Sequence, residues 1–101
     1  MSVLLQVDFP FSGPFGAEMA AALTDLANSI NGEPGFIWKI WTENEGEQSA
    51  GGIYMFADKE SAQNYLTMHT ERLAGFGITD VRGKIFDINE ALTDINKGPK
   101  A

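Results

Sequence analysis

The first stretch of the chain alternates apolar and polar positions, which is the pattern of a β-strand with one buried face. Over residues 3–9 the buried face would carry Val3, Leu5, Val7 and Phe9. The opposite face would carry Leu4, Gln6 and Asp8. Asp8 can lie at the solvated end of the strand, but Gln6 sits in mid-strand, where a buried amide needs hydrogen-bond partners.

Two later stretches change to a helical period. The first would begin at Ser12-Gly13-Pro14, with proline at or near the first helical position, and end at Asn31-Gly32. Its apolar face recurs at steps of four, three and four: Met19, Leu23, Leu26 and Ile30. The second would follow the N-cap Asp58 and run to about Ala74. Its inward stripe would be Ala62, Tyr65, Leu66, His69 and Leu73.

The segment EPGFIWKIWTE at 33–43 combines a turn with a strand rich in aromatic and β-branched residues. On a regular strand, one face would carry Phe36, Trp38, Ile40 and Thr42. The other would carry Ile37, Lys39, Trp41 and Glu43. We expect Trp38 in the core and Trp41 on the back of the sheet, covered by a second copy of the chain. The alternative is that Trp41 is an incidental, partly exposed ring.

The remaining pattern completes a mixed fold. The polar residues 43–51 read as a hairpin tip, and the strand 53–57 follows Gly51-Gly52, whose glycines allow a β-bulge. A last strand is expected at 81–88, and residues 89–101 form a C-terminal extension with one or two helical turns. The order β-α-β-β-α-β predicts a ferredoxin-like α+β fold, with two helices on one face of a four-stranded antiparallel sheet.

The composition narrows the class of function. A length of 101 residues predicts a single domain. The net charge of −7 argues against nucleic acid as a partner, since no basic patch is available to neutralise phosphates. The absence of cysteine excludes disulfides, zinc–thiolate sites, iron–sulfur clusters and a thiol nucleophile, and a single histidine excludes a multi-histidine metal site. With no signal-peptide pattern and no apolar run long enough to span a membrane, we expect a cytoplasmic protein without a membrane partner.

Familiar catalytic motifs are missing, so the candidate chemistry lies among the aromatics and the single histidine. His69 is either a satisfied structural histidine or a proton acceptor or donor to a ligand, and Arg72 lies one turn further along the same helix. Trp38, Tyr54 and Phe86 are either ordinary core aromatics or the walls of a ligand pocket. Lys39 and other charges nearby are expected at the sheet margins or in a dimer interface. The residues alone do not decide between these structural and functional interpretations.

Five spaced blocks resemble the bacterial YdhR family of monooxygenases. They are GPFG at 13–16, EPGF-x-WK-x-WTE at 33–43, AGGIY-x-F at 50–56, HT-x-RL at 69–73 and K-x-FD-x-NE at 84–90. The resemblance implies a dimeric α+β barrel whose sheets form the homodimer interface. It also implies similarity to cofactor-independent antibiotic-biosynthesis monooxygenases, which oxidise polycyclic phenols with molecular oxygen and no metal or flavin. Haem-degrading relatives use an asparagine on the first strand, where this chain has Gln6.

The resulting hypothesis is a homodimeric oxygenase that acts on a small aromatic substrate with molecular oxygen and no cofactor or metal. His69 would be the base or oxyanion partner, and Arg72 or Gln6 would stabilise negative charge. The catalytic residues would be His69, Tyr54 and Trp38. The substrate-binding residues would be Gln6, Arg72, Phe86 and Tyr65. The alternatives are a non-catalytic protein that binds a small hydrophobic ligand and a cofactor-free isomerase or cyclase.

Overall fold

Seven elements follow one another in the computed structural model, which describes residues 1–99. They are β1 (Val3–Pro10), α1 (Gly16–Ile30), β2 (Phe36–Asn44), β3 (Ser49–Phe56), α2 (Lys59–Gly75), β4 (Arg82–Asp87) and α3 (Glu90–Ile95). The strands form one antiparallel sheet in the order β2-β3-β1-β4. This order, in which β1 and β3 are the central strands, confirms the predicted ferredoxin-like α+β fold.

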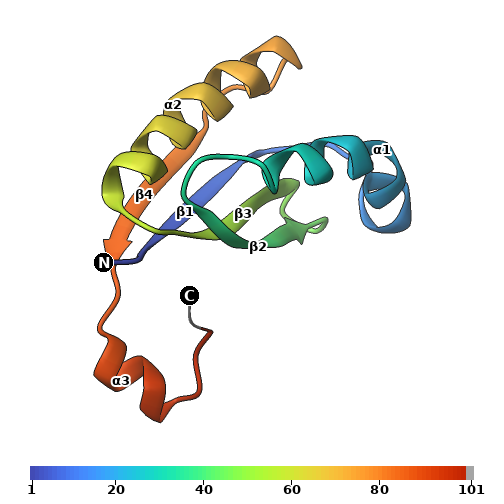
Figure 1. The fold of residues 1–101 in the computed structure, drawn as a ribbon. Helices are drawn as coiled ribbons and strands as arrows, with labels where there is room; N and C mark the ends of the chain where they lie inside the picture. The colour runs from blue at the N-terminus through green and yellow to red at the C-terminus, as the bar shows by residue number, and fades with distance from the viewer. Residues whose placement is uncertain (100–101) are drawn as a thin grey trace.

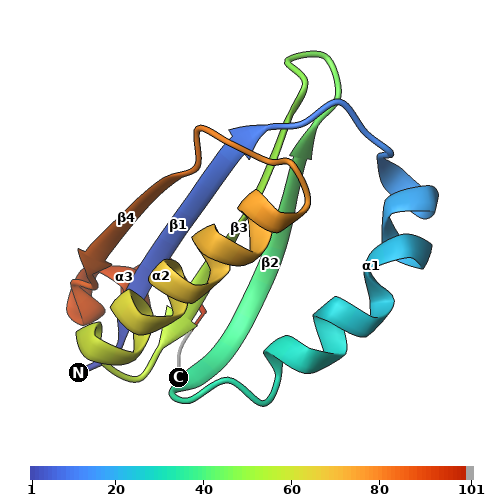
Figure 2. The same cartoon turned by 90° about the horizontal axis from the view of Figure 1, so that it is seen from above.

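The helices divide between the two faces of the sheet. Figure 1 shows α1 and α2 on one side of the sheet and α3 on the other. Seen from above, α2 crosses over the central strands, whereas α1 lies beside the edge strand β2, well apart from α2 (Figure 2). The last two residues of the predicted C-terminal extension, 100 and 101, lie outside the described residues. No helix within residues 1–99 is long and apolar enough to cross a membrane.

The core lies between α2 and the sheet face that it covers. β1 alternates as predicted, and its buried members are Val3, Leu5, Val7 and Phe9. Their partners on β3 include Tyr54 and Phe56, which are also sealed from solvent. α2 adds Ala62, Tyr65 and Leu73 to this cluster at the predicted helical spacing. Its N-terminus is capped as expected, because the Asp58 carboxylate accepts a hydrogen bond from the Ser61 N–H at 2.7 Å.

A β-bulge at the start of β2 reverses the predicted placement of the tryptophans. Phe36 pairs with Phe56 on the helix-covered face, but Trp38 pairs with Met55, so Ile37 is an extra residue. Directly paired residues project from the same face of a sheet, and Trp38 therefore lies on the far face beside Met55. The prediction that Trp38 is a core residue was wrong. The bulge also lies here and not at Gly51-Gly52, where the register is continuous.

The same shift brings Lys39 and Trp41 onto the face that carries the helices. Lys39 pairs with the buried Tyr54, and Trp41 pairs with Gly52. Trp41 lines hollows together with Met19 of α1, so the prediction that it lies on the back of the sheet was wrong as well. The tryptophan nearest to the helices is Trp41, at 37% exposure.

α1 begins later than predicted and is held at its N-terminus by a strand residue. The helix starts at Gly16, after Pro14, and the Gly16 N–H donates to the Glu43 carboxylate at 3.0 Å. A carboxylate at this position satisfies one of the unpaired N–H groups of the helix start. The Glu43 contact thus ties α1 to the edge strand β2, which keeps α1 apart from α2.

Candidate functional site

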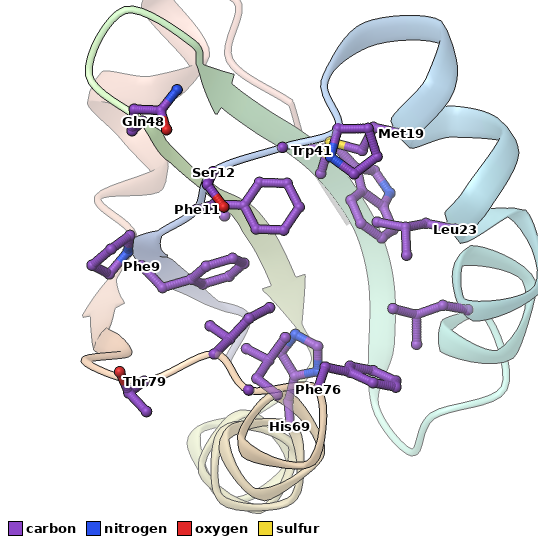
Figure 3. A pocket seen from close by; sticks show the side chains of 18 of the residues that line it. Phe9, Phe11, Ser12, Met19, Leu23, Trp41, Gln48, His69, Phe76 and Thr79 are labelled. Atoms are coloured by element: carbon purple, nitrogen blue, oxygen red, sulfur yellow. The ribbon is translucent and has the colours of Figure 1, made fainter.

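A cavity of about 610 Å³ opens between α1 and α2 above the sheet. Its walls are mainly apolar and come from several parts of the chain: Phe9, Phe11, Met19, Leu23, Trp41 and Phe76. Figure 3 shows Trp41 and His69 on opposite sides of the cavity, with Phe9 and Phe11 along its left-hand side. The volume and the aromatic walls are typical of a small-molecule site, in which a few polar groups orient the ligand.

His69 lies on the stripe of α2 that faces the sheet and is 4% exposed. Its Nδ1 accepts hydrogen bonds from Arg72, from Nε at 3.3 Å and from Nη2 at 2.9 Å. A guanidinium has only donors, so the neutral imidazole carries its proton on Nε2. Within residues 1–99, Nε2 has no hydrogen-bond partner and is not sealed from solvent. His69 therefore presents an N–H donor to the cavity.

The surroundings of His69 keep it neutral. Burial lowers its pKa to about 3, and the nearby charges of Arg72 and Lys39 act in the same direction. The ring also stacks on Tyr65, with centroids 5.1 Å apart and planes 25° apart. An imidazole held in this way is fixed in orientation and in tautomer, which suits a hydrogen-bond donor better than a proton acceptor.

Two tyrosines continue the hydrogen-bond chain into the core. Arg72 Nη2 donates to the Tyr65 hydroxyl at 3.4 Å, and that hydroxyl donates to the Tyr54 hydroxyl at 3.2 Å. Burial raises the pKa of both phenols, so both stay protonated at neutral pH. Arg72 therefore donates hydrogen bonds both to His69 and to the buried tyrosine pair.

Lys39 lines the cavity, although the sequence analysis placed it at a sheet margin or in a dimer interface. Its Nζ lies 3.3 Å from the centroid of the Trp41 ring and 4.6 Å from that of Tyr54. Burial lowers the pKa of Lys39 to about 7, and the positive charge of Arg72 adds to this effect. Its side chain leans over Gly52, the residue paired with Trp41, where an added Cβ would lie 2.6 Å from Lys39 Cε.

Among residues 1–99, no aspartate or glutamate lines the cavity. Its polar side chains are those of Lys39, the neutral His69 and the uncharged residues Ser12, Gln48 and Thr79. This contrasts with the whole chain, whose net charge is −7. Among residues 1–99, no group of three or more histidine, cysteine, aspartate or glutamate side chains is arranged to hold a metal ion.

The structure divides the predicted site residues into three groups. His69 lines the cavity. Arg72, Tyr65 and Tyr54 lie behind it in one hydrogen-bonded chain. The third group lies on the far face of the sheet, as the strand register shows: Trp38, Gln6 and Phe86.

The placement of this third group corrects the prediction that its members share a pocket with His69. Gln6 is exposed and pairs with Ile53 and Lys84, so the alternation of β1 turns it away from the helices. Phe86 is 41% exposed and pairs with Leu4, which lies on the same far face. The bulge places Trp38 on the far face of the sheet and not on the predicted helix side.

The comparison with protein families decides the identity of the chain. Residues 4–99 match the family described as "Putative mono-oxygenase ydhR". The chain belongs to the ydhR family. The resemblance seen in the five sequence blocks is thereby confirmed, and so is the assignment of the chain to a family of monooxygenases. No curated protein sequence matches the chain closely enough to count as a relative.

Two solved structures have the same fold as the ydhR chain. One is SnoaB, a cofactor-independent oxygenase from Streptomyces nogalater, with a TM-score of 0.62 and 16% identity over 87% of this chain and 93% of that one. Another is a "putative antibiotic biosynthesis monooxygenase" from Deinococcus radiodurans, with a TM-score of 0.56 and 15% identity over 88% and 93% of the two chains. At these identities, the likeness establishes a shared fold.

Proposed function

We propose that this ydhR-family protein is a cofactor-independent monooxygenase that oxidises a small hydroxylated aromatic compound with molecular oxygen. The observation that carries the proposal is the aromatic-walled cavity with a neutral His69 N–H directed into it. Apolar walls fit a planar ring, and the donor fits the oxygen of a phenol or phenolate. The similarity of fold to SnoaB, a cofactor-independent oxygenase, supports the same chemistry.

The reaction needs an electron-rich ring, which is itself the reductant. Loss of the phenol proton leaves an anion whose negative charge is shared with ring carbons, and one of these carbons forms a bond to oxygen. The O–O bond then breaks, one oxygen atom stays on the ring as a quinone carbonyl, and the other leaves as water with the two hydrogens that the phenol has lost. The atoms and electrons balance without an external reductant.

Each residue of the His69 network has a distinct role in this proposal. His69 Nε2–H binds the substrate oxygen and stabilises the negative charge that develops on it. Arg72 is a positioning residue, because its donors to Nδ1 fix the tautomer that places the proton on Nε2. Tyr65 and Tyr54 hold Arg72 and the histidine ring in place from the core side.

The homodimer expected from the sequence is part of this proposal. Its support is the far face of the sheet, where Ile40 is 50% exposed and Phe86 is 41% exposed. The neighbouring α3 adds Leu92 and Ile95, at 60% and 73% exposure. Large apolar side chains gathered in this way are typical of a surface that is covered in the working protein. A second sheet packed on this face leaves the cavity on the helix side free.

Oxygen uptake with a panel of hydroxylated aromatics tests the proposed function. The wild-type protein, freed of metal by a chelator, is expected to consume oxygen with at least one electron-rich member of the panel. His69→Ala should still bind that compound but lose most of its turnover, by about 100-fold, as expected for one lost oxyanion donor. Tight binding of phenols without any oxygen uptake would instead identify a ligand-binding protein.

A further inference from the structure

Lys39 can reach the cavity because the neighbouring strand has no side chain at Gly52. Its side chain crosses β3 at Gly52, where any Cβ would lie 2.6 Å from Lys39 Cε. The amine ends above the face of Trp41, 3.3 Å from the ring centroid, and within 4.6 Å of the centroid of Tyr54. Lys39 is thus directed by the absence of a side chain at Gly52 and by the two aromatic rings.

Among the described residues, the Lys39 amine has no anionic partner of its own. Lys39 makes no ion pair or side-chain hydrogen bond to any of residues 1–99. Along its own strand face the nearest acid is Glu43, whose carboxylate is bound to the Gly16 N–H. A buried amine without a counter-ion is costly to keep charged, so a ligand that supplies a negative oxygen would be bound favourably.

The groups that face Lys39 from other elements favour the neutral amine. β3 contributes Tyr54, which stays protonated, and α2 contributes His69, which stays neutral, together with Arg72 and Tyr65. The cavity-lining residues from β1 and α1 carry no charge. Burial and the Arg72 charge lower the pKa of Lys39 to about 7, so that about half of the amines are neutral at pH 7. An ordinary lysine, with a pKa of about 10.4, would be almost fully protonated there and unable to accept a proton.

We propose that Lys39 is a catalytic residue that takes the proton from the hydroxyl of an aromatic substrate and then holds the resulting phenolate, together with the His69 Nε2–H. In this step the substrate O–H bond breaks, its electron pair stays on oxygen, and a new N–H bond forms on Lys39. No electron is transferred, so the step needs no oxidant. The inference rests on the proposed function and completes it, because His69 carries its proton on the nitrogen that faces the cavity and so lacks a free lone pair there.

The proposal defines the substrate by its acidity. Proton transfer to an amine with a pKa of about 7 is efficient only when the pKa of the hydroxyl is comparable or lower. Phenols conjugated to a carbonyl group meet this condition and remain oxidisable when the ring carries further electron-donating hydroxyl groups. Nitrophenols are acidic enough to probe the proton transfer but too electron-poor to be oxidised. Simple alkylphenols, with a pKa close to that of tyrosine at about 10, are not acidic enough.

4-Nitrophenol is a direct probe of this step, because its hydroxyl titrates near neutrality and its phenolate absorbs visible light. Near pH 7, where a substantial fraction of the Lys39 amines is neutral, 4-nitrophenol bound to the wild-type protein is expected to show a stronger phenolate band than the same amount of free probe. Lys39→Met keeps the length of the side chain but removes the amine, and it should bind the probe at least about tenfold more weakly, without that band. The matched control is Lys59→Met, at the exposed start of α2 and outside the cavity lining, which should behave as wild type.

The outcomes separate this inference from the proposed oxygenase activity. Bound probe that remains neutral, a phenolate band that persists in Lys39→Met, or no binding to the wild type would each overturn the role of Lys39. Thermal unfolding and circular dichroism of Lys39→Met verify that the variant is folded. Lys39→Arg provides a second variant: as a permanent cation it can hold the phenolate but cannot accept the phenol proton, so binding near pH 7 should release that proton to the solution, whereas the neutral amine of the wild type should take it up. If the protein binds phenolate through Lys39 but consumes no oxygen, the inference about Lys39 stands and the proposed oxygenase function is wrong.

Discussion

Arg72 directs two donors, Nε and Nη2, at a single acceptor, Nδ1 of His69, at 3.3 and 2.9 Å. Since a guanidinium cannot accept a hydrogen bond, this contact determines which imidazole nitrogen carries the proton. The cavity therefore meets an N–H of His69 and not a basic nitrogen. Under the proposed function, His69 would therefore act as the oxyanion partner and not as the base.

Removal of the guanidinium should raise the pKa of His69. Burial is the larger cause of the lowered value, and it persists in Arg72→Met, so the pKa is expected to rise from about 3 only part of the way to 6.5. The chain has a single histidine, so its imidazole resonances can be followed by NMR during a pH titration without assignment. Arg82→Met, at the exposed end of β4, is the control. An unchanged titration in Arg72→Met would contradict the assigned hydrogen bonds.

The stability of the protein should fall in mildly acidic solution because of His69. The unfolded chain binds a proton on this residue near pH 6.5, but the folded protein binds it only near pH 3. Between these values the unfolded state holds more protons, so the free energy of unfolding decreases as the pH falls, by up to about 1.4 kcal/mol per pH unit. His69→Gln should remove this slope in urea unfolding measured above the range in which carboxylates titrate. Equal slopes in the two proteins would show that His69 is protonated in the fold.

Gly51 and Gly52 are adjacent but should respond differently to alanine. A Cβ at Gly51 would meet the β1 backbone, 2.9 Å from Asp8 Cα, and neither strand can move without loss of pairing. We expect Gly51→Ala to lower the free energy of unfolding by about 3 kcal/mol. A Cβ at Gly52 meets the flexible end of Lys39, so Gly52→Ala should cost about 1 kcal/mol or less.

The Gly52→Ala variant should nevertheless change the chemistry of the cavity. With Lys39 displaced from Trp41 towards solvent, its pKa should rise towards the ordinary lysine value. NMR titration of the lysine Cε resonances measures this change, and weaker 4-nitrophenol binding should accompany it. If the variant binds the probe like the wild type, the path of the Lys39 side chain over Gly52 is not needed for the site.

The proposed dimer makes a separate prediction at the far face of the sheet. Ile40→Glu places a charge on the exposed apolar surface, at the edge strand β2, and it should yield monomers in sedimentation velocity where the wild type forms dimers. Asn64→Glu, on the exposed side of α2, is the control with the same added charge. A wild type that sediments as a monomer at high concentration would contradict the dimer.

The sequence predicted those parts of the fold that depend on regular periodicity. The alternation of Val3, Leu5 and Val7 and the helical spacing of Tyr65, His69 and Leu73 both placed the core correctly, because burial follows the strand and helix repeats. The bulge at Ile37 was not predictable in this way, since one extra residue reverses every later side chain without any change in composition.

Because the side-chain orientation predicted for β2 was wrong, the site residues predicted on this strand were wrong as well. Trp38 was assigned to the pocket and Lys39 to a margin, because both assignments assumed an unbroken strand after Pro34-Gly35. Residues on α2, such as His69 and Arg72, were assigned correctly to one cluster because a helix keeps its phase. The neutral state of Lys39 depends on packing against Gly52 and on the Arg72 charge, which are tertiary contacts.

The most direct test of the account follows the oxygen atoms. The metal-free, flavin-free protein is incubated with an acidic phenol that supports oxygen uptake, under oxygen labelled with the heavy isotope, and the product is analysed by mass spectrometry. The account predicts that one labelled atom enters each product molecule, and that Lys39→Met and His69→Ala form little product while Lys59→Met forms as much as the wild type. Product that carries no label, or equal yields from all four proteins, would contradict it.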